Sequence, residues 1–246
     1  MKRKYIAGLA TGLMMVGATV LANATSVTVT YTGDNVVDSF YLVDMSTHTL
    51  AAVGAIGSNY WNWRQSDSFT FNGLVQNDNY AIVWHAYNVS DDSDPRSIIN
   101  TAYNNPVNGN PAAFLAQITG DIIGGPIDSS SNSIWKYSVP TDNILMNTFN
   151  ALDVIDNSTW GNVQAYGQNG SGDIWADVYG TVRGINTSAQ WIWSSQSDAA
   201  NGNDPSLFIM AQFQADPPAS VPEPATMLLF GTGLIGIAGL VRKKIA

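Results

Sequence analysis

The sequence predicts an all-β protein, a sandwich of two sheets that lies between two terminal targeting segments. Composition is the first observation: residues 25–220 are rich in Asp, Asn, Ser and Gly, which favour turns, and poor in Glu, Lys and Arg, which favour helices. Periodicity is the second, because short apolar segments alternate with polar residues and are separated by polar turns. This stretch has no long amphipathic helix pattern, although a short helix over 147–156 fits.

The predicted strands follow one another at short intervals. Segment 26–31 (SVTVTY) alternates Val27 and Val29 with threonine, the pattern of a half-buried strand. Segment 80–88 (YAIVWHAYN) is a continuous β-prone run, so we expect it at the centre of a sheet. Segment 206–214 (SLFIMAQFQ) alternates again. Further strands are predicted at 69–74, 112–118, 174–182 and 189–193, with turn clusters at 91–95, 124–133 and 167–173.

Residues 1–24 have the pattern of a secretory signal peptide with an N-terminal signal helix. A basic start (MKRKY) precedes an apolar run over 6–21, and Ala22 and Ala24 are the small residues of a cleavage site. The alternative, a retained membrane anchor, fits less well because these small residues lie where a signal peptidase cuts. The sequence contains no cysteine, which excludes disulfides, cysteine metal sites and lipoprotein anchoring of the body over 25–216.

The C-terminal part divides into a Pro-rich linker at 217–224, an apolar helix at 225–241 and a basic tail at 242–246. A helix over 225–241 would measure about 26 Å, near the short limit for crossing the apolar core of a bilayer. Basic residues stay on the cytoplasmic side of a membrane, so we expect the body outside. The alternative is a buried helix of a soluble domain, which the flanking prolines and the basic cluster disfavour. This cluster consists of Arg242, Lys243 and Lys244.

Pro222, Glu223 and Pro224, followed by a glycine-containing apolar helix and the basic cluster, resemble the PEP-CTERM sorting signal over 221–246. The resemblance implies that exosortase, a membrane-embedded transpeptidase-like protease, recognises the tripeptide and releases or transfers the protein. Proteins with this signal typically occur in Gram-negative bacteria that make extracellular polysaccharide, and many are linked to biofilm or floc matrix. A proline-bounded tripeptide also suits a protease, because neither helix nor sheet can hide it.

The body resembles the jelly-roll modules of galactose-binding type that accompany some glycoside hydrolases. The resemblance rests on GDNVVDSFYLVDM, NYWNWRQSDSFTFNGLVQNDNYAIVWHAYN and NPAAFLAQITG, and later on IWKYS, FNALDVIDNSTWGNVQAYG and AQWIWSS. Two features depart from those modules: the Trp-Ile-Trp strand comes late, and VDMSTH (43–48) stands in place of a Val-Asn-Gly hairpin. The resemblance implies a jelly-roll-like sandwich over most of 33–195, but it transfers no binding residue.

Trp61, Trp63 and Arg64 are candidate sugar-binding residues, because sugar rings stack their apolar faces on aromatic rings while polar groups bond their edges. Trp175, beside the glycine-rich loop at 167–173, is the fourth candidate. The alternative for Trp61 and Trp63 is burial on one face of a strand, since they alternate. Three other tryptophans are expected in the core: Trp84, Trp191 and Trp193.

The body is strongly acidic, since four basic and eighteen acidic residues over 25–220 give a net charge of −14. Such a surface repels phosphate backbones, which excludes nucleic acid as a partner. Asp91, Asp92 and Asp94 could supply oxygen ligands to calcium, but they lack EF-hand spacing, and short acidic turns are usually only solvated. No other cofactor is predicted. A weaker group of the same kind consists of Asp34, Asn35 and Asp38.

The sequence shows no catalytic signature. Of the two histidines, His48 and His85, the second lies inside a β-run and is expected to be a satisfied core residue. Neither neighbours a G-x-S-x-G, H-E-x-x-H or phosphate-loop pattern, while eighteen Asp residues leave a glycosidase carboxylate pair open. We therefore expect a non-enzymatic, exported surface or matrix protein that associates with extracellular polysaccharide. The alternatives are a polysaccharide-active hydrolase or lyase and a purely structural surface protein.

Overall fold

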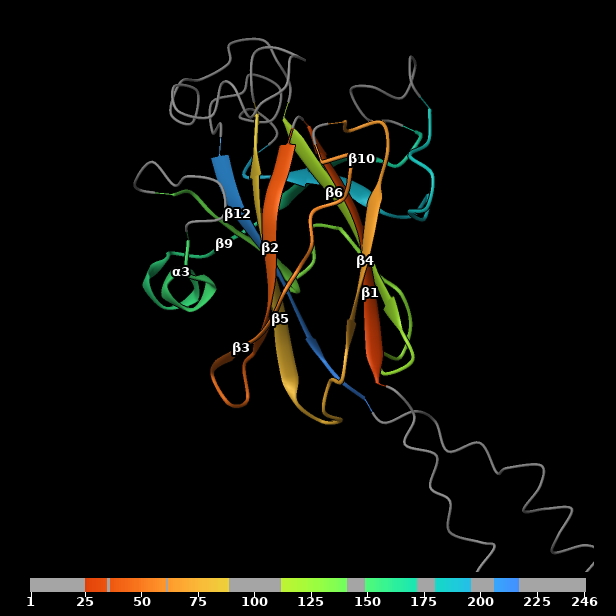
Figure 1. Cartoon of the computed structure of the whole chain (residues 1–246). Helices are drawn as coiled ribbons and strands as arrows, with labels where there is room; N and C mark the ends of the chain where they lie inside the picture. Colours follow the sequence, from red (N-terminus) through yellow and green to blue (C-terminus); the bar gives the residue numbers. More distant parts are fainter. Residues whose placement is uncertain are drawn as a thin grey trace, which may run out of the picture.

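The computed structural model shows two β-sheets packed face to face (Figure 1). Both predicted terminal helices lie outside the residues that the structure describes, and so do the cleavage-site residues Ala22 and Ala24. Within the described residues, no helix has the length and apolar character needed to cross a membrane. The described residues are 25–34, 36–60, 62–88, 112–140, 149–171, 180–195 and 206–216.

The first sheet consists of β1 (Ser26–Asp34), β4 (Asp67–Asn72), β6 (Ala113–Gly120), β7 (Ile127–Asp128), β10 (Gln164–Gln168) and β11 (Gln190–Trp193). Its strand order is β10-β11-β6-β1-β4, and the short strand β7 pairs with β6 in addition to this order. Each pairing is antiparallel. The interior strand β1 places Val29 between Phe69 of β4 and Ile118 of β6.

The second sheet consists of β2 (Val36–Asp44), β3 (Thr49–Val53), β5 (Asn79–Tyr87), β8 (Trp135–Ser138), β9 (Gly161–Asn162) and β12 (Ser206–Gln214). It is antiparallel throughout, with the order β3-β2-β5-β12-β8-β9. The register of β2 shifts against β5 between Val37 and Ser39, so that Ser39 lies opposite His85. This bulge adds one residue, Asp38, beside the central strand.

This architecture confirms the predicted all-β sandwich, and the described residues contain one short helix, α3 (Ala151–Asn157). The jelly-roll resemblance agrees with two antiparallel sheets but stays an interpretation. Six observed strands overlap predicted segments: β1, β4, β5, β6, β11 and β12. Strand β2 was not among the predicted segments, because all of its residues are buried and its sequence lacks clean alternation. Most of the predicted strand at 174–182 lies outside the described residues.

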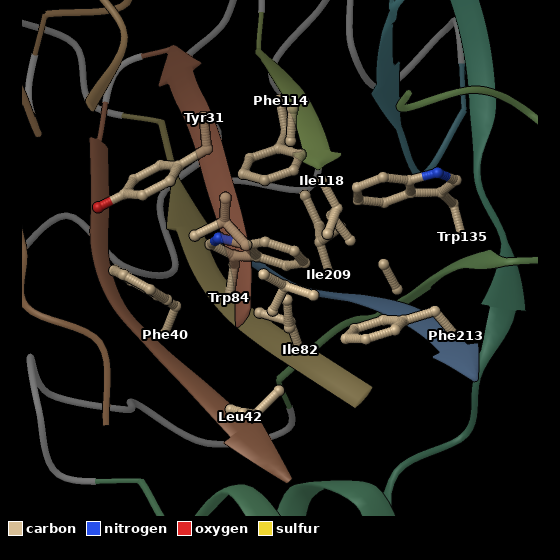
Figure 2. Close-up of a cluster of buried hydrophobic side chains, with 14 of the residues drawn as sticks. Tyr31, Phe40, Leu42, Ile82, Trp84, Phe114, Ile118, Trp135, Ile209 and Phe213 are labelled. Atoms are coloured by element: carbon tan, nitrogen blue, oxygen red, sulfur yellow. The ribbon is translucent and has the colours of Figure 1, made fainter. Parts of the chain in front are cut away.

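The core between the sheets is rich in aromatic side chains (Figure 2). Trp84 of β5 stacks on Trp135 of β8 with ring centroids 5.8 Å apart, and Phe114 of β6 lies 5.4 Å from Trp84. Phe40 and Tyr31 extend this cluster between β2 and β1, with centroids 5.0 Å apart. Since each buried aromatic side chain removes about 150–250 Å² from water, such a core stabilises a chain that has no disulfide.

The second sheet is also covered on its outer face, by α3 and the residue that leads into it (Figure 1). Phe149 packs on Tyr41 of β2 and Phe208 of β12, with centroid distances of 4.7 and 4.9 Å. Val154 of α3 joins the same cluster and is buried. This cover buries the outward side chains of the central strands, which therefore read as nearly continuous apolar runs.

The first sheet is covered on its outer face by the loop that precedes β11. Val182 and Ile185 from this loop pack against Leu115 of β6 and Trp191 of β11. Trp191 is therefore buried, as expected, but on the outer face of its sheet. The other two tryptophans expected in the core, Trp84 and Trp193, lie between the sheets.

Candidate functional site

A groove of about 710 Å³ lies between α3 and the β8–β9 edge of the second sheet, and it is open to solvent. This volume is in the ordinary range for ligand-binding clefts. Phe149, Val154 and Phe208, which are buried, supply its apolar part. Tyr137 of β8 also borders the groove, but its half-buried ring packs against the core between the sheets. The polar residues that line the groove are Asn150, Asp153, Asn157, Ser158 and Thr159.

The local sequence of α3 explains how the polar side chains reach the groove. Asn150 caps the helix, because its Oδ1 accepts the backbone N–H of Leu152 at 3.0 Å. Asp153 and Asn157 are four residues apart, so they lie on one face of the helix, and both are exposed. Val154 is buried against the sheet, which fixes the rotation of the helix about its axis. The groove face of α3 is therefore polar and its sheet face apolar.

A glycine allows the Tyr137 ring to approach the opposite edge of the groove closely. Tyr137 pairs with Gly161 of β9 in the antiparallel register. A Cβ atom at position 161 would lie 2.7 Å from Cε1 of Tyr137, too close for an unchanged ring position. Any larger residue at this position would therefore displace the Tyr137 ring at the β8–β9 edge that borders the groove.

The groove combines apolar side chains with polar groups that have no hydrogen-bond partner among the described residues. Within the described part of the chain, no hydrogen bond engages the side chains of Asp153, Asn157 or Thr159. A carboxylate, an amide and a hydroxyl can together accept and donate hydrogen bonds at the edge of a ligand. The Phe149 and Phe208 rings offer an apolar surface to the same ligand. These are the groups that a sugar requires.

A second cluster of polar residues lies deep on the outer face of the second sheet. His85 of β5 is at its centre: its Nδ1 lies 2.9 Å from Oδ1 of Asp38, and its Nε2 lies 2.7 Å from Oγ of Ser206. The Ser39 hydroxyl also donates to Oδ1 of Asp38, at 2.8 Å. A serine hydrolase triad has the same arrangement, with a carboxylate at Nδ1 of the histidine and a hydroxyl at its Nε2.

The surroundings of this cluster are those of a structural network. His85 has no exposed surface, Asp38 is 1% exposed and Ser206 is 5% exposed. The His85 ring lies 5.2 Å from that of Phe208 and 6.0 Å from that of Phe149, and none of the three triad-like residues lines the groove. The expectation that His85 is a satisfied core residue is therefore confirmed. Sequence reasoning placed Asp38 in a candidate calcium group and missed its association with His85 and Ser206, because strand pairing alone brings these three positions together.

Two of the four predicted sugar-binding residues, Trp63 and Arg64, are described, and they lie outside the groove. Trp63 is half-buried and packs edge-on against Trp191 on the outer face of the first sheet, with centroids 6.2 Å apart. The guanidinium carbon of Arg64 lies 5.1 Å from the Trp63 ring centroid, in a cation–π contact. Trp61 and Trp175 lie outside the described residues. Sugar binding by these four residues stays a prediction.

The predicted calcium ligands Asp91, Asp92 and Asp94 lie outside the described residues. Of the weaker acidic group, Asp34 and Asp38 are both buried. Within the ranges that the structure describes, no group of three or more His, Cys, Asp or Glu residues could hold a metal ion.

Two carboxyl groups elsewhere have pKa values that depart from the ordinary value. Burial raises the pKa of Asp67, although both of its oxygens accept the backbone N–H of Asn59. At Asp44, burial also acts to raise the pKa, but hydrogen bonds from Thr47 and Ser46 outweigh it and lower the pKa. Both residues hold turns in place, and neither lines the groove.

Comparison with known families identifies the C-terminal segment. Residues 220–243 match the PEP-CTERM protein-sorting motif. The chain thus carries the predicted sorting signal, with the tripeptide Pro222, Glu223 and Pro224 inside the matched segment. This motif implies an exported protein that an exosortase sorts, and that is anchored and processed at the membrane. Comparison with curated proteins and with solved structures gives no match for this chain.

Proposed function

We propose that the protein is a surface or extracellular-matrix protein that binds exopolysaccharide in the groove beside α3 and has no enzymatic activity. One observation carries the proposal: a single open groove combines the apolar side chains of Phe149, Val154 and Phe208 with carboxylate, amide and hydroxyl groups that have no hydrogen bond within the described residues. An open groove suits a segment of an extended polymer, whereas an enclosed pocket suits a small molecule. The sorting motif supports a place beyond the inner membrane, where such polymers accumulate.

The proposal is tested by glycan-array binding of the full-length chain, purified in detergent, with a pair of glycine variants. Gly161→Ala should displace the Tyr137 ring, shift the β8–β9 edge of the groove and weaken binding about fivefold, because a lost contact costs roughly 1 kcal/mol. Gly125→Ala is the matched control, since a Cβ atom at position 125 has no neighbour within 4 Å. This control should bind like the unchanged protein.

Three outcomes separate the possible sites. Weaker binding in Gly161→Ala alone supports the groove. Loss of binding in Trp175→Ala, with Gly161→Ala unaffected, would move the site to the predicted aromatic residues and overturn the groove. Binding to no glycan would overturn the lectin-like function and favour a purely structural role.

A second candidate function is hydrolysis of an ester on the polysaccharide, which the hydrogen-bonded series Asp38, His85 and Ser206 favours. Burial of all three residues weighs against it, because a nucleophilic hydroxyl must reach its substrate. Reaction of Ser206 with a fluorophosphonate probe distinguishes the two functions.

A further inference from the structure

We propose that the groove beside α3 prefers glycans that carry free amino groups, such as polymers of deacetylated hexosamine. This inference rests on the proposed function, because it concerns the same groove. It names the chemical class of polymer that the groove selects.

The charge of the groove carries the inference. Asp153 is the charged residue among the described residues that line it, and these described lining residues include neither Lys nor Arg. The Asp153 side chain is exposed and free of hydrogen bonds within the described residues, so it can accept a bond from a ligand. An ammonium group is the strongest partner for such a carboxylate, because the bond is charge-assisted.

The basic side chain of β8 does not reverse this charge. Lys136 of β8 lies next to Tyr137 in the sequence, but its Nζ donates to Oδ1 of Asn162 across the β8–β9 pair. Lys136 does not line the groove. On the other side, α3 carries a second carboxylate, Asp156, which lies 3.1 Å from Nε2 of His48.

The field of the whole body acts in the same direction. A net charge of −14 over 25–220 attracts cationic polymers and repels polymers rich in uronic acids or sulfate. Because this attraction acts between exposed charges, salt screens it over about 10 Å at 0.1 M. Neutral, N-acetylated polymers would keep the apolar contact with Phe149 and Phe208 but lose the charge-assisted bond to Asp153.

The test compares two hexamers of one sugar, the glucosamine hexamer and the N-acetylglucosamine hexamer, by calorimetric titration at pH 6, where the amines are charged. The full-length chain in detergent should bind the amino hexamer at least tenfold more tightly. Asp153→Asn should remove most of this preference and leave binding of the acetylated hexamer unchanged. Asp121→Asn is the matched control, because it removes one exposed charge outside the groove.

The results that contradict the inference differ from those that contradict the proposed function. Equal or tighter binding of the acetylated hexamer, or of a polyuronate, overturns the amino-sugar preference while glycan binding stands. An equal loss of preference in Asp121→Asn also overturns it, since the effect would then come from net charge alone. Failure to bind either hexamer, together with a glycan array on which nothing binds, overturns both.

Discussion

At the residue scale, His85 connects three neighbouring strands of the second sheet. Asp38 belongs to β2, His85 to β5 and Ser206 to β12, so the two hydrogen bonds of the imidazole cross the sheet sideways. A one-residue slip of β2 or β12 would point its side chains to the opposite face and break one of these bonds. The network therefore specifies strand register, which fits its complete burial.

This interpretation predicts that Ser206→Ala destabilises the fold. The variant leaves Nε2 of His85 buried without its partner, so the free energy of unfolding should fall by about 1–3 kcal/mol in urea denaturation. The control is Ser68→Ala, which removes a surface hydrogen bond between the Ser68 and Thr30 hydroxyls. This change should lower the free energy of unfolding by at most about 0.5 kcal/mol. Rapid fluorophosphonate labelling of Ser206 that disappears in His85→Gln would instead identify a hydrolase.

At the scale of the elements, regular alternation and continuous apolar runs made strands predictable. Strand β12 lies at the predicted bounds 206–214, since its apolar residues alternate, and β5, which is buried on both faces, was predicted from its continuous run. Strand β2 escaped because the buried polar residues Asp38 and Ser39 interrupt its apolar run and its bulge breaks the alternation. The groove could not be predicted at all, because β8, α3 and β12 meet there from distant parts of the chain.

The turn from β2 to β3 supplies a pH-dependent prediction. Hydrogen bonds from Ser46 and Thr47 hold the pKa of Asp44 below its unfolded value of about 3.9, despite the opposing effect of burial. The stabilising contribution of Asp44 is therefore complete above pH 4 and is lost as the pH falls through the lower, folded pKa. Asp44→Asn should be about 1 kcal/mol less stable than the unchanged protein at pH 7, and the difference should shrink toward pH 2.

Asp67 serves as the opposite control in the same urea titrations. Its folded pKa is raised, chiefly by burial, so its contribution is complete below the unfolded pKa and is lost as the pH rises through the folded pKa. The pH dependence of Asp67→Asn relative to the unchanged protein should therefore have the reverse sign. An Asp44→Asn difference that stays constant between pH 2 and pH 7 would contradict the assigned hydrogen bonds.

At the scale of the whole molecule, the start and the end of the described chain meet at the turn that follows β6. The Ser26 N–H donates to Oδ1 of Asp121 at 2.8 Å, and the Asp216 N–H donates to the carbonyl oxygen of Ile122 at 2.6 Å. Strand β1 begins and β12 ends at the same end of the body (Figure 1). The leader and the sorting tail are therefore connected to one end of the sandwich.

The sorting motif gives the prediction at this scale. In cells that contain an exosortase, the unchanged chain should lose its C-terminal segment, whereas Glu223→Ala should retain it in most molecules. Mass spectrometry of the C-terminus measures this difference, and Ser220→Ala, outside the tripeptide, should be processed normally. Identical processing of the unchanged chain in cells that lack exosortase would refute the assignment.

Strand β12 also has a mechanical consequence. Phe208, near its start, lines the groove, and its last residues lead to the tail, so tension from a captured polymer would travel along this one strand. All nine residues of β12 are in register with β5, and four of them also face β8. A lengthwise pull must shear these bonds together rather than unzip them singly, so β12 would resist being pulled out of its sheet.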